Sequence, residues 1–328
     1  MKLWQHFASL GLISMLGSGC CHLPSSSGAK RPSLPQPLAV QFTYLKAEGL
    51  VCQEKDKTSN RDYSIKTIEL TSPSPEKGTN RSLVLDYFIP RTTGKHPVIV
   101  ILPMLGGSYP LEKYFAAYFG KRGYASIIVH REKPPKDASF EVLDALLKQS
   151  VLDNRQAIDW IETRAELDPR RIGVFGISMG AIKGALLMPV EPRIRAATLG
   201  LAGGDVPYIL TYTTENGISK RRDVILREQH LTRLELHGKI GQCIHCDPNA
   251  VAPFVDPKKV LLILGACDTV VPINKGLELR NRMGKPETIV VPTGHYSAIL
   301  FLPYIQHQCY RFFEKKLAPQ SPVLGRAN

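Results

Sequence analysis

The chain has 328 residues, of which 43% are hydrophobic, with a formal net charge of +13 and an isoelectric point near 9.4. This length and composition suffice for one large core, and α/β domains of such length commonly stay undivided. Lys and Arg are scattered and no zinc-finger, RNP or helix-turn-helix signature accompanies them, which argues against nucleic-acid binding and favours a basic surface near anionic lipid.

The first 19 residues have the pattern of a cleaved signal peptide. Their apolar stretch, residues 7–16, is too short to span a bilayer, which takes about 20 residues. The small residues before Cys20 resemble the lipobox of bacterial lipoproteins, and this resemblance implies a lipid on Cys20 and a location at the bacterial cell envelope. Gly17 stands where the lipobox usually has leucine, so Cys21 is an alternative lipidation site and a secreted or periplasmic protein is an alternative outcome.

The segment that follows is rich in Pro, Ser and basic residues at positions 22–38. Such a composition favours an extended tether that does not bury a core. We therefore assign residues 20–60 to the lipid anchor, flexible tether and lead-in, residues 61–318 to the folded domain, and residues 319–328 to a disordered tail.

Strand-like and helix-like patterns alternate through the domain. Residues 63–70 and 83–89 are predicted to pair as a hairpin, and residues 97–102 form the continuous apolar run of a strand buried on both faces. The remaining predicted elements are helices at 111–122, 140–164, 272–283 and 296–317, the last broken near Pro303, and strands at 124–129, 196–201, 259–264 and 287–291. An antiparallel entry followed by βαβ alternation implies an α/β fold with a mostly parallel sheet and helices on both faces.

Gly176-Ile-Ser-Met-Gly180 lies between a strand-like run and a helix-like run. This order is typical of a nucleophile elbow, in which a serine occupies a turn too tight for side chains two residues before and after it. The turn is expected to lift Ser178 above the sheet and to place the Met179 N–H at a helix N-terminus, aimed at an oxyanion. Taken alone, such a pentapeptide also arises by chance in glycine-rich loops.

The predicted strand at 97–102 leads directly into a loop that contains Gly106 and Gly107. Glycines at this point let the backbone approach the elbow and offer it a second oxyanion donor, with the Leu105 N–H as first choice and the Gly106 N–H as second. The alternative is an ordinary turn between a strand and a helix.

Asp268 and His295 each follow a predicted strand at its carboxyl end, where the catalytic groups of open α/β sheets collect. An imidazole can take the proton of a serine hydroxyl, and a carboxylate fixes the imidazole's tautomer and orientation. Each residue alone could be a helix-capping aspartate or a surface histidine. The chain order Ser178, Asp268, His295 favours a catalytic triad.

These motifs together resemble the α/β-hydrolase superfamily over about residues 63–317, above all its esterase and dienelactone-hydrolase-type branch. The resemblance implies a serine carboxylic-ester hydrolase for small or medium acyl substrates that works through an acyl-enzyme without a metal or organic cofactor. One departure is Pro103-Met104, where the family often has His-Gly before the oxyanion loop. A serine peptidase or other acyl hydrolase is one alternative, and a non-catalytic envelope protein with an inert hydrolase fold is another.

Residues 205–257 interrupt the alternation and are expected to form a cap over the site. A basic helix is predicted at 218–236, either as a solvated face or as a surface that steers an anionic substrate. Its basic residues are Lys220, Arg221, Arg222, Arg227 and Arg233. Tyr208, Tyr212 and Phe254 are candidates for an acyl pocket or for core packing.

The chain contains seven cysteines. An exported protein permits disulfides, but the spacing does not determine their pairing. Cys243 and Cys246 have the spacing of a metal or redox pair, yet no second pair lies at ligand spacing. A disulfide or buried free thiols are therefore expected, and no metal site is predicted.

Overall fold

The structure is a computed structural model of the chain, and it describes residues 19–26, 31–44, 46, 51–73, 80–104, 109–130 and 139–319. The predicted signal peptide up to residue 18, the loop residues 105–108 and the tail from residue 320 lie outside the described residues. Within the described part of the chain, no helix is long and apolar enough to cross a membrane.

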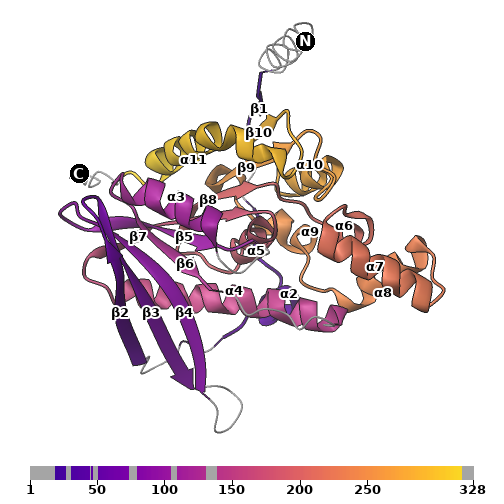
Figure 1. Cartoon of the computed structure of the whole chain (residues 1–328), viewed down its shortest axis with the longest axis horizontal. Coiled ribbons are helices and arrows are strands. Elements are labelled where there is room, and N and C mark those ends of the chain that lie inside the picture. Colours follow the sequence, from indigo (N-terminus) through magenta and orange to yellow (C-terminus); the bar gives the residue numbers. More distant parts are fainter. Residues whose placement is uncertain are drawn as a thin grey trace, which may run out of the picture.

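A mixed sheet of ten strands forms the centre of the described chain (Figure 1). Neighbouring parallel strands make up its middle, in the spatial order β10 (Glu287–Val291), β9 (Val260–Gly265), β8 (Ile194–Gly200), β7 (Leu167–Ile177), β5 (His96–Leu102) and β6 (Ala125–Val129). Antiparallel strands extend both edges: β4 (Asn80–Pro90), β3 (Tyr63–Pro73) and β2 (Val51–Ser59) beyond β6, and β1 (Cys21–Leu23) beyond β10. The predicted hairpin and the mostly parallel sheet are confirmed.

Helices cover both faces of the sheet because side chains along each strand alternate between the faces. In β5, Val98 and Val100 pack on one side with residues of α4 (Phe140–Glu162) and α5 (Met179–Leu187). Ile99 and Ile101 pack on the other side with aromatic residues of α3 (Pro110–Gly120) and α11 (Leu302–Lys316). Figure 1 shows α3 and α11 on one side of the sheet and α4 on the other. Every residue of β5 is buried, which explains its continuous apolar run.

The N-terminal segment differs from the predicted extended tether. Strand β1 pairs with β10, with Cys21 opposite Val290, and α2 (Gln36–Val40) lies just before the buried Phe42. Strand β2 extends the sheet beyond the predicted hairpin. Backbone hydrogen bonds at a sheet edge need no apolar side chains, so composition alone gives no signal of this pairing.

The region between β8 and β9 is helical, with α6 (Val206–Tyr212), α7 (Asn216–Glu228), α8 (Arg233–Cys243), α9 (Pro248–Val251) and the short turns η1 (Ala252–Phe254) and η2 (Pro257–Lys259). The single helix predicted at 218–236 is wrong. His230 adopts a left-handed conformation (φ 51°), and Thr232 starts α8 through a capping box with Glu235. Figure 1 shows α7 and α8 at the end of the molecule away from β2, β3 and β4.

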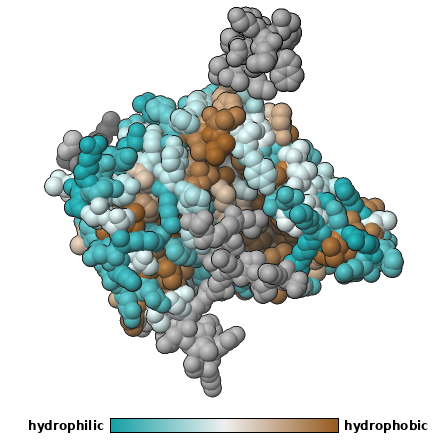
Figure 2. Space-filling model, viewed as in Figure 1, coloured by the Kyte–Doolittle hydropathy of each residue, from teal (hydrophilic) through white to brown (hydrophobic). Residues whose placement is uncertain are grey.

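The last two predicted helices are confirmed with small shifts of their bounds. Helix α10 (Ile273–Arg282) follows β9, and the turn η3 (Ser297–Phe301) precedes α11 where the break near Pro303 was expected. In Figure 2, apolar residues lie in a hollow between the body of the molecule and the helices at its α7 end.

Candidate active site

Ser178 occupies the turn between β7 and α5 with φ 56° and ψ −122°, a conformation that residues with a side chain rarely adopt. A Cβ atom on Gly176 would lie 2.4 Å from the Gly180 backbone, and one on Gly180 would lie 2.1 Å from the Leu102 carbonyl oxygen. The Ser178 N–H donates to the Gly200 carbonyl at 2.8 Å. The two glycines are therefore sterically required, as an elbow needs.

His295 lies in the loop between β10 and η3 and faces both other residues of the predicted triad. Its Nε2 is 3.0 Å from Ser178 Oγ, and its Nδ1 is 2.7 Å from Asp268 Oδ2. The side chains of His295 and Asp268 are 10% and 1% exposed. With the proton on Nδ1, the imidazole donates to Asp268 and its Nε2 accepts from the serine hydroxyl.

Asp268 is held by the turn that follows β9. Its Oδ1 accepts hydrogen bonds from the N–H groups of Val270 and Val271, both at 2.9 Å. The aspartate does not cap α10, whose N-cap residue is Pro272. The structure thus brings together side chains from three distant segments at the carboxyl ends of parallel strands.

The expected oxyanion donors are placed only in part. Met179 is the first residue of α5, where a backbone N–H has no acceptor within the helix. Leu105 and Gly106 lie outside the described residues. The Met104 N–H before them donates at 2.9 Å to Glu112, a buried carboxylate on α3 that sequence reasoning did not single out. Because Glu112 stands in an ordinary helical pattern, no sequence signal marks its contact with this loop.

A cavity of about 360 Å³ opens in front of Ser178 and His295, and we call it the catalytic cavity. Its wall is mainly aliphatic and includes Leu201, Ile209 and Ile305. At the surface it is bordered by Tyr296 and Ile299, whose exposed fractions are 67% and 65%.

The three aromatic residues that the sequence suggests for an acyl pocket do not line the catalytic cavity. Tyr208, Tyr212 and Phe254 are absent from its wall. Tyr208 instead stacks against Tyr212 at 4.5 Å between ring centroids and lies 4.2 Å below the Lys275 ammonium group. A packing role for Tyr208 and Tyr212, the alternative left open by the sequence, agrees with these contacts.

Arg222 does not lie on a solvated basic face of α7, which was one of the two roles expected for the basic residues of this region. Its guanidinium group is buried and donates to the carbonyl oxygens of Thr211 and Thr213, at 3.3 and 2.8 Å, and to Asp223 at 2.9 Å. Arg222 therefore holds α7 against the end of α6.

All seven cysteines are free thiols in the structure. Burial raises the pKa of Cys246 and of Cys309 to about 12, and the Cys243 thiol donates to Glu141 at 3.0 Å. Within the described residues, no group of three or more His, Cys, Asp or Glu side chains is arranged to hold a metal ion.

No family model matches the chain. An uncharacterised protein of Mycobacterium tuberculosis is 28% identical over 198 residues, which cover 58% of this chain and 43% of that protein. A probable 2-oxo-3-(5-oxofuran-2-ylidene)propanoate lactonase of Bradyrhizobium is 25% identical over 129 residues, which cover 37% of this chain and 52% of the lactonase. The chain thus spans about half the length of these curated relatives or less.

Solved structures match over much more of the chain. Acetyl xylan esterase 1 of Thermoanaerobacterium superposes with a TM-score of 0.65 and 16% identity, covering 90% of this chain and 97% of the esterase. Acetyl xylan esterase of Paenibacillus gives a TM-score of 0.61 and 18% identity, covering 87% and 100%. The chain therefore has an α/β-hydrolase-like fold, a mixed sheet with helices on both faces.

Proposed function

We propose that this protein is a serine ester hydrolase with Ser178 as nucleophile, His295 as general base and Asp268 as the carboxylate that orients the histidine. The observation that carries the proposal is the pair of contacts made by His295, 3.0 Å to Ser178 Oγ and 2.7 Å to Asp268 Oδ2. A strained serine backbone at the start of a helix adds support, because such strain collects at functional sites.

In the proposed reaction, Ser178 Oγ attacks the ester carbonyl while His295 Nε2 takes the hydroxyl proton. The tetrahedral oxyanion accepts hydrogen bonds from the Met179 N–H and from the loop after Met104, by way of Leu105 or Gly106. His295 then gives its proton to the departing alkoxide, and the acyl group stays on Ser178. A water molecule that loses its proton to His295 attacks this acyl-enzyme, the acid leaves, and Ser178 recovers its proton. Asp268 stays ionised throughout and stabilises the imidazolium.

Two further observations support an ester as substrate. The structural neighbours carry the names acetyl xylan esterase and methylesterase, and one sequence relative is a probable lactonase. The catalytic cavity is mainly aliphatic, which suits a small or medium acyl group better than a charged one.

The test is hydrolysis of nitrophenyl butyrate by the purified protein and by Ser178→Ala. We expect turnover to fall by at least about 10⁴-fold, because a hydroxyl nucleophile has no substitute in alanine. Ser219→Ala, at a partly exposed residue of α7 that does not border the catalytic cavity, is the matched control. A fluorophosphonate probe should label the protein and the control but not Ser178→Ala. Retained turnover in Ser178→Ala would remove the mechanism, and failure of the probe to label the unchanged protein would favour an inert hydrolase fold. A peptide anilide in the same assay separates a peptidase from an esterase.

We further propose that the signal peptide is removed and that Cys20 carries a lipid at the cell envelope. The proposal rests on the small residues directly before Cys20, and the arrangement of β1 says where such a lipid would lie. His22 Nε2 lies 2.8 Å from the Tyr304 hydroxyl, and Cys20 packs on the same apolar cluster as Tyr304. Leu302, two residues before Tyr304, borders the catalytic cavity, so a lipid on Cys20 would bring that cavity close to the membrane.

Metabolic labelling of the full chain in a bacterial host with an alkyne-tagged palmitate tests this anchor. Labelling should be lost in Cys20→Ser and kept in Cys21→Ser, and the labelled protein should fractionate with membranes. Labelling that persists in Cys20→Ser and disappears in Cys21→Ser would move the site by one residue. No labelling of the unchanged chain would favour simple secretion.

A further inference from the structure

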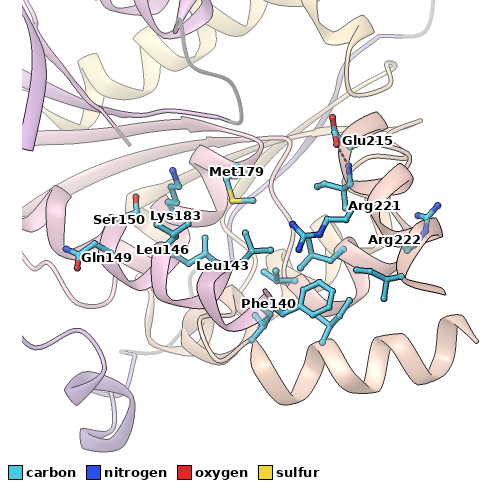
Figure 3. Close-up of a pocket in the computed structure, with 18 of the residues that line it drawn as sticks. Phe140, Leu143, Leu146, Gln149, Ser150, Met179, Lys183, Glu215, Arg221 and Arg222 are labelled. Atoms are coloured by element: carbon cyan, nitrogen blue, oxygen red, sulfur yellow. Dashed lines mark hydrogen bonds between the residues drawn. The ribbon is translucent and has the colours of Figure 1, made fainter. Parts of the chain in front are cut away.

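A second cavity of about 360 Å³ lies between α4 and the helices α7 and α8 (Figure 3). We call it the α4–α8 cavity. Protein interiors seldom contain voids much larger than a water molecule, and this volume falls in the usual range of ligand sites, roughly 300–1,000 Å³. None of the three residues of the proposed triad borders it.

The α4–α8 cavity and the catalytic cavity share part of their walls. Five residues border both cavities: Met179, Val206, Leu210, Glu215 and Ile218. The two spaces are therefore neighbours across these side chains, all of which are apolar except Glu215. Met179 directly follows Ser178 in the chain, and its unbranched side chain can change rotamer more easily than a branched one.

The wall of the α4–α8 cavity is mainly aliphatic, with Leu143 and Leu146 from α4, Ile225 from α7 and Leu236 and Ile240 from α8. Figure 3 shows the polar residues toward its two ends, with Gln149, Ser150 and Lys183 at one end and Arg221, Arg222 and Glu215 toward the other.

Several of these polar groups are engaged within the protein. Glu215 Oε2 accepts from the Ile218 N–H at 2.7 Å, and Arg222 donates to the Thr213 carbonyl at 2.8 Å. At the other end, Gln149 donates to Asp153 at 3.0 Å, and Lys183 donates to the Pro103 carbonyl at 3.4 Å. The surface left for a ligand is hence mainly apolar.

We propose that the α4–α8 cavity binds an unbranched aliphatic chain of the substrate, with the scissile ester held at Ser178. This inference rests on the proposed ester-hydrolase function. The chain passes over Met179 and Ile218 from one cavity into the other, and each methylene that leaves water adds to binding. Favoured substrates therefore carry an aliphatic chain longer than the catalytic cavity alone can hold.

The kinetic test compares nitrophenyl dodecanoate with nitrophenyl acetate in Leu143→Trp, which places an indole in the α4–α8 cavity. Relative to the unchanged protein, the ratio of kcat/KM for dodecanoate to that for acetate should fall by about tenfold or more, since even one methylene in an apolar pocket is worth about tenfold. Val142→Trp adds the same indole to α4 at a residue that is 38% exposed and does not border the cavity, and it should keep the ratio. Equal ratios in the two variants would overturn the proposal.

A binding test separates this proposal from the proposed reaction. Ser178→Ala cannot turn over an ester by the proposed route, and this variant therefore reports binding alone. If the α4–α8 cavity takes an aliphatic chain, Ser178→Ala should bind dodecanoate saturably in a calorimetric titration. Ser178→Ala/Leu143→Trp should bind at least about tenfold more weakly, with an unchanged circular dichroism spectrum. Absence of dodecanoate binding to Ser178→Ala overturns the chain-binding site. If the unchanged protein hydrolyses neither ester, the proposed function fails, and the titration still decides whether the cavity takes an aliphatic chain.

Discussion

Asp268 divides its two carboxylate oxygens between the fold and the candidate site. Oδ1 is held by the N–H groups of Val270 and Val271, and Oδ2 faces His295 Nδ1 at 2.7 Å. A carboxylate fixed in this way can hold the imidazole in one orientation and tautomer. Because the two oxygens have different partners, a substitution that changes only the group facing His295 can separate orientation of the histidine from support of the turn.

Asp268→Asn should lower kcat for nitrophenyl butyrate by about 10⁴-fold, the effect known from the same change in another serine hydrolase triad. The asparagine oxygen can still accept from Val270 and Val271, while its NH₂ group faces His295 and favours the wrong tautomer. The free energy of unfolding in urea should therefore change little. A variant that keeps its activity would show that Asp268 does not orient His295.

Asp86 on β4 gives a prediction for stability at acid pH. Its side chain is 1% exposed, 3.0 Å from the Lys57 ammonium and 3.5 Å from His130 Nε2. Burial alone would raise its pKa, but His130 and Lys57 together outweigh burial and hold the pKa at about 2, below the ordinary 3.8. Because the folded-state pKa is the lower one, this stabilisation is present above about pH 4 and is lost as the pH falls toward 2.

Urea unfolding of Asp86→Asn should accordingly show a deficit of about 2 kcal/mol at pH 6 relative to the unchanged protein, and this deficit should shrink between pH 4 and pH 2. Asp56→Asn removes an exposed carboxylate from strand β2, which lies beyond β3 in the sheet, and serves as control. A deficit that stays constant over this range would contradict the assigned cause.

At the scale of elements, the sequence predicts helices and strands correctly where the local pattern of apolar residues is strong. Strands β5 and β9 are predicted from short apolar runs, because parallel strands buried on both faces need apolar residues at nearly every position. The sequence pattern merges helices α7 and α8, because residues 229–232 contain no Gly or Pro and basic residues, Arg227 and Arg233, stand on both sides of them. The capping box of Thr232 with Glu235 was the sequence signal that could have separated them.

The turn between β7 and α5 yields a prediction with a matched control. Gly180→Ala should destabilise the protein by at least about 1–3 kcal/mol, because its Cβ would lie 2.1 Å from the Leu102 carbonyl, a backbone atom that cannot give way locally. Gly238→Ala, inside α8 with no atom within 4 Å of the new Cβ, should stabilise by about 0.5–1 kcal/mol. Thermal unfolding of both variants measures the contrast, and equal effects would contradict the close approach at Gly180.

At the scale of the whole molecule, the described residues shortly before β2 pack onto the folded domain. The Phe42 carbonyl accepts from Arg155 at 2.7 Å, and the Tyr44 hydroxyl donates to Asp159 at 2.6 Å. Lys46 bonds Glu162 at 2.9 Å. These contacts fix the described part of residues 36–46 against α4.

Phe42→Ala should therefore lower the free energy of unfolding by about 3–5 kcal/mol, since its side chain is 1% exposed and belongs to the main core. Val40→Ala, two residues earlier and 59% exposed, should change it by less than about 0.5 kcal/mol. Urea unfolding measures both variants. A small effect at Phe42 would restore the picture of a loosely attached tether.

The sequence by itself determined the parallel strands, the helices that cover them and the three segments that carry Ser178, Asp268 and His295. Local patterns specify these features, and the carboxyl ends of parallel strands necessarily share one edge of a sheet. Only the tertiary structure decided the pairing of β1 with β10, the burial of Phe42, the contact of Glu112 with Met104 and the α4–α8 cavity. All but the Met104–Glu112 contact, which spans eight positions, join residues far apart in the chain. No local pattern of side chains encodes which distant partner a backbone group or a helix face will meet.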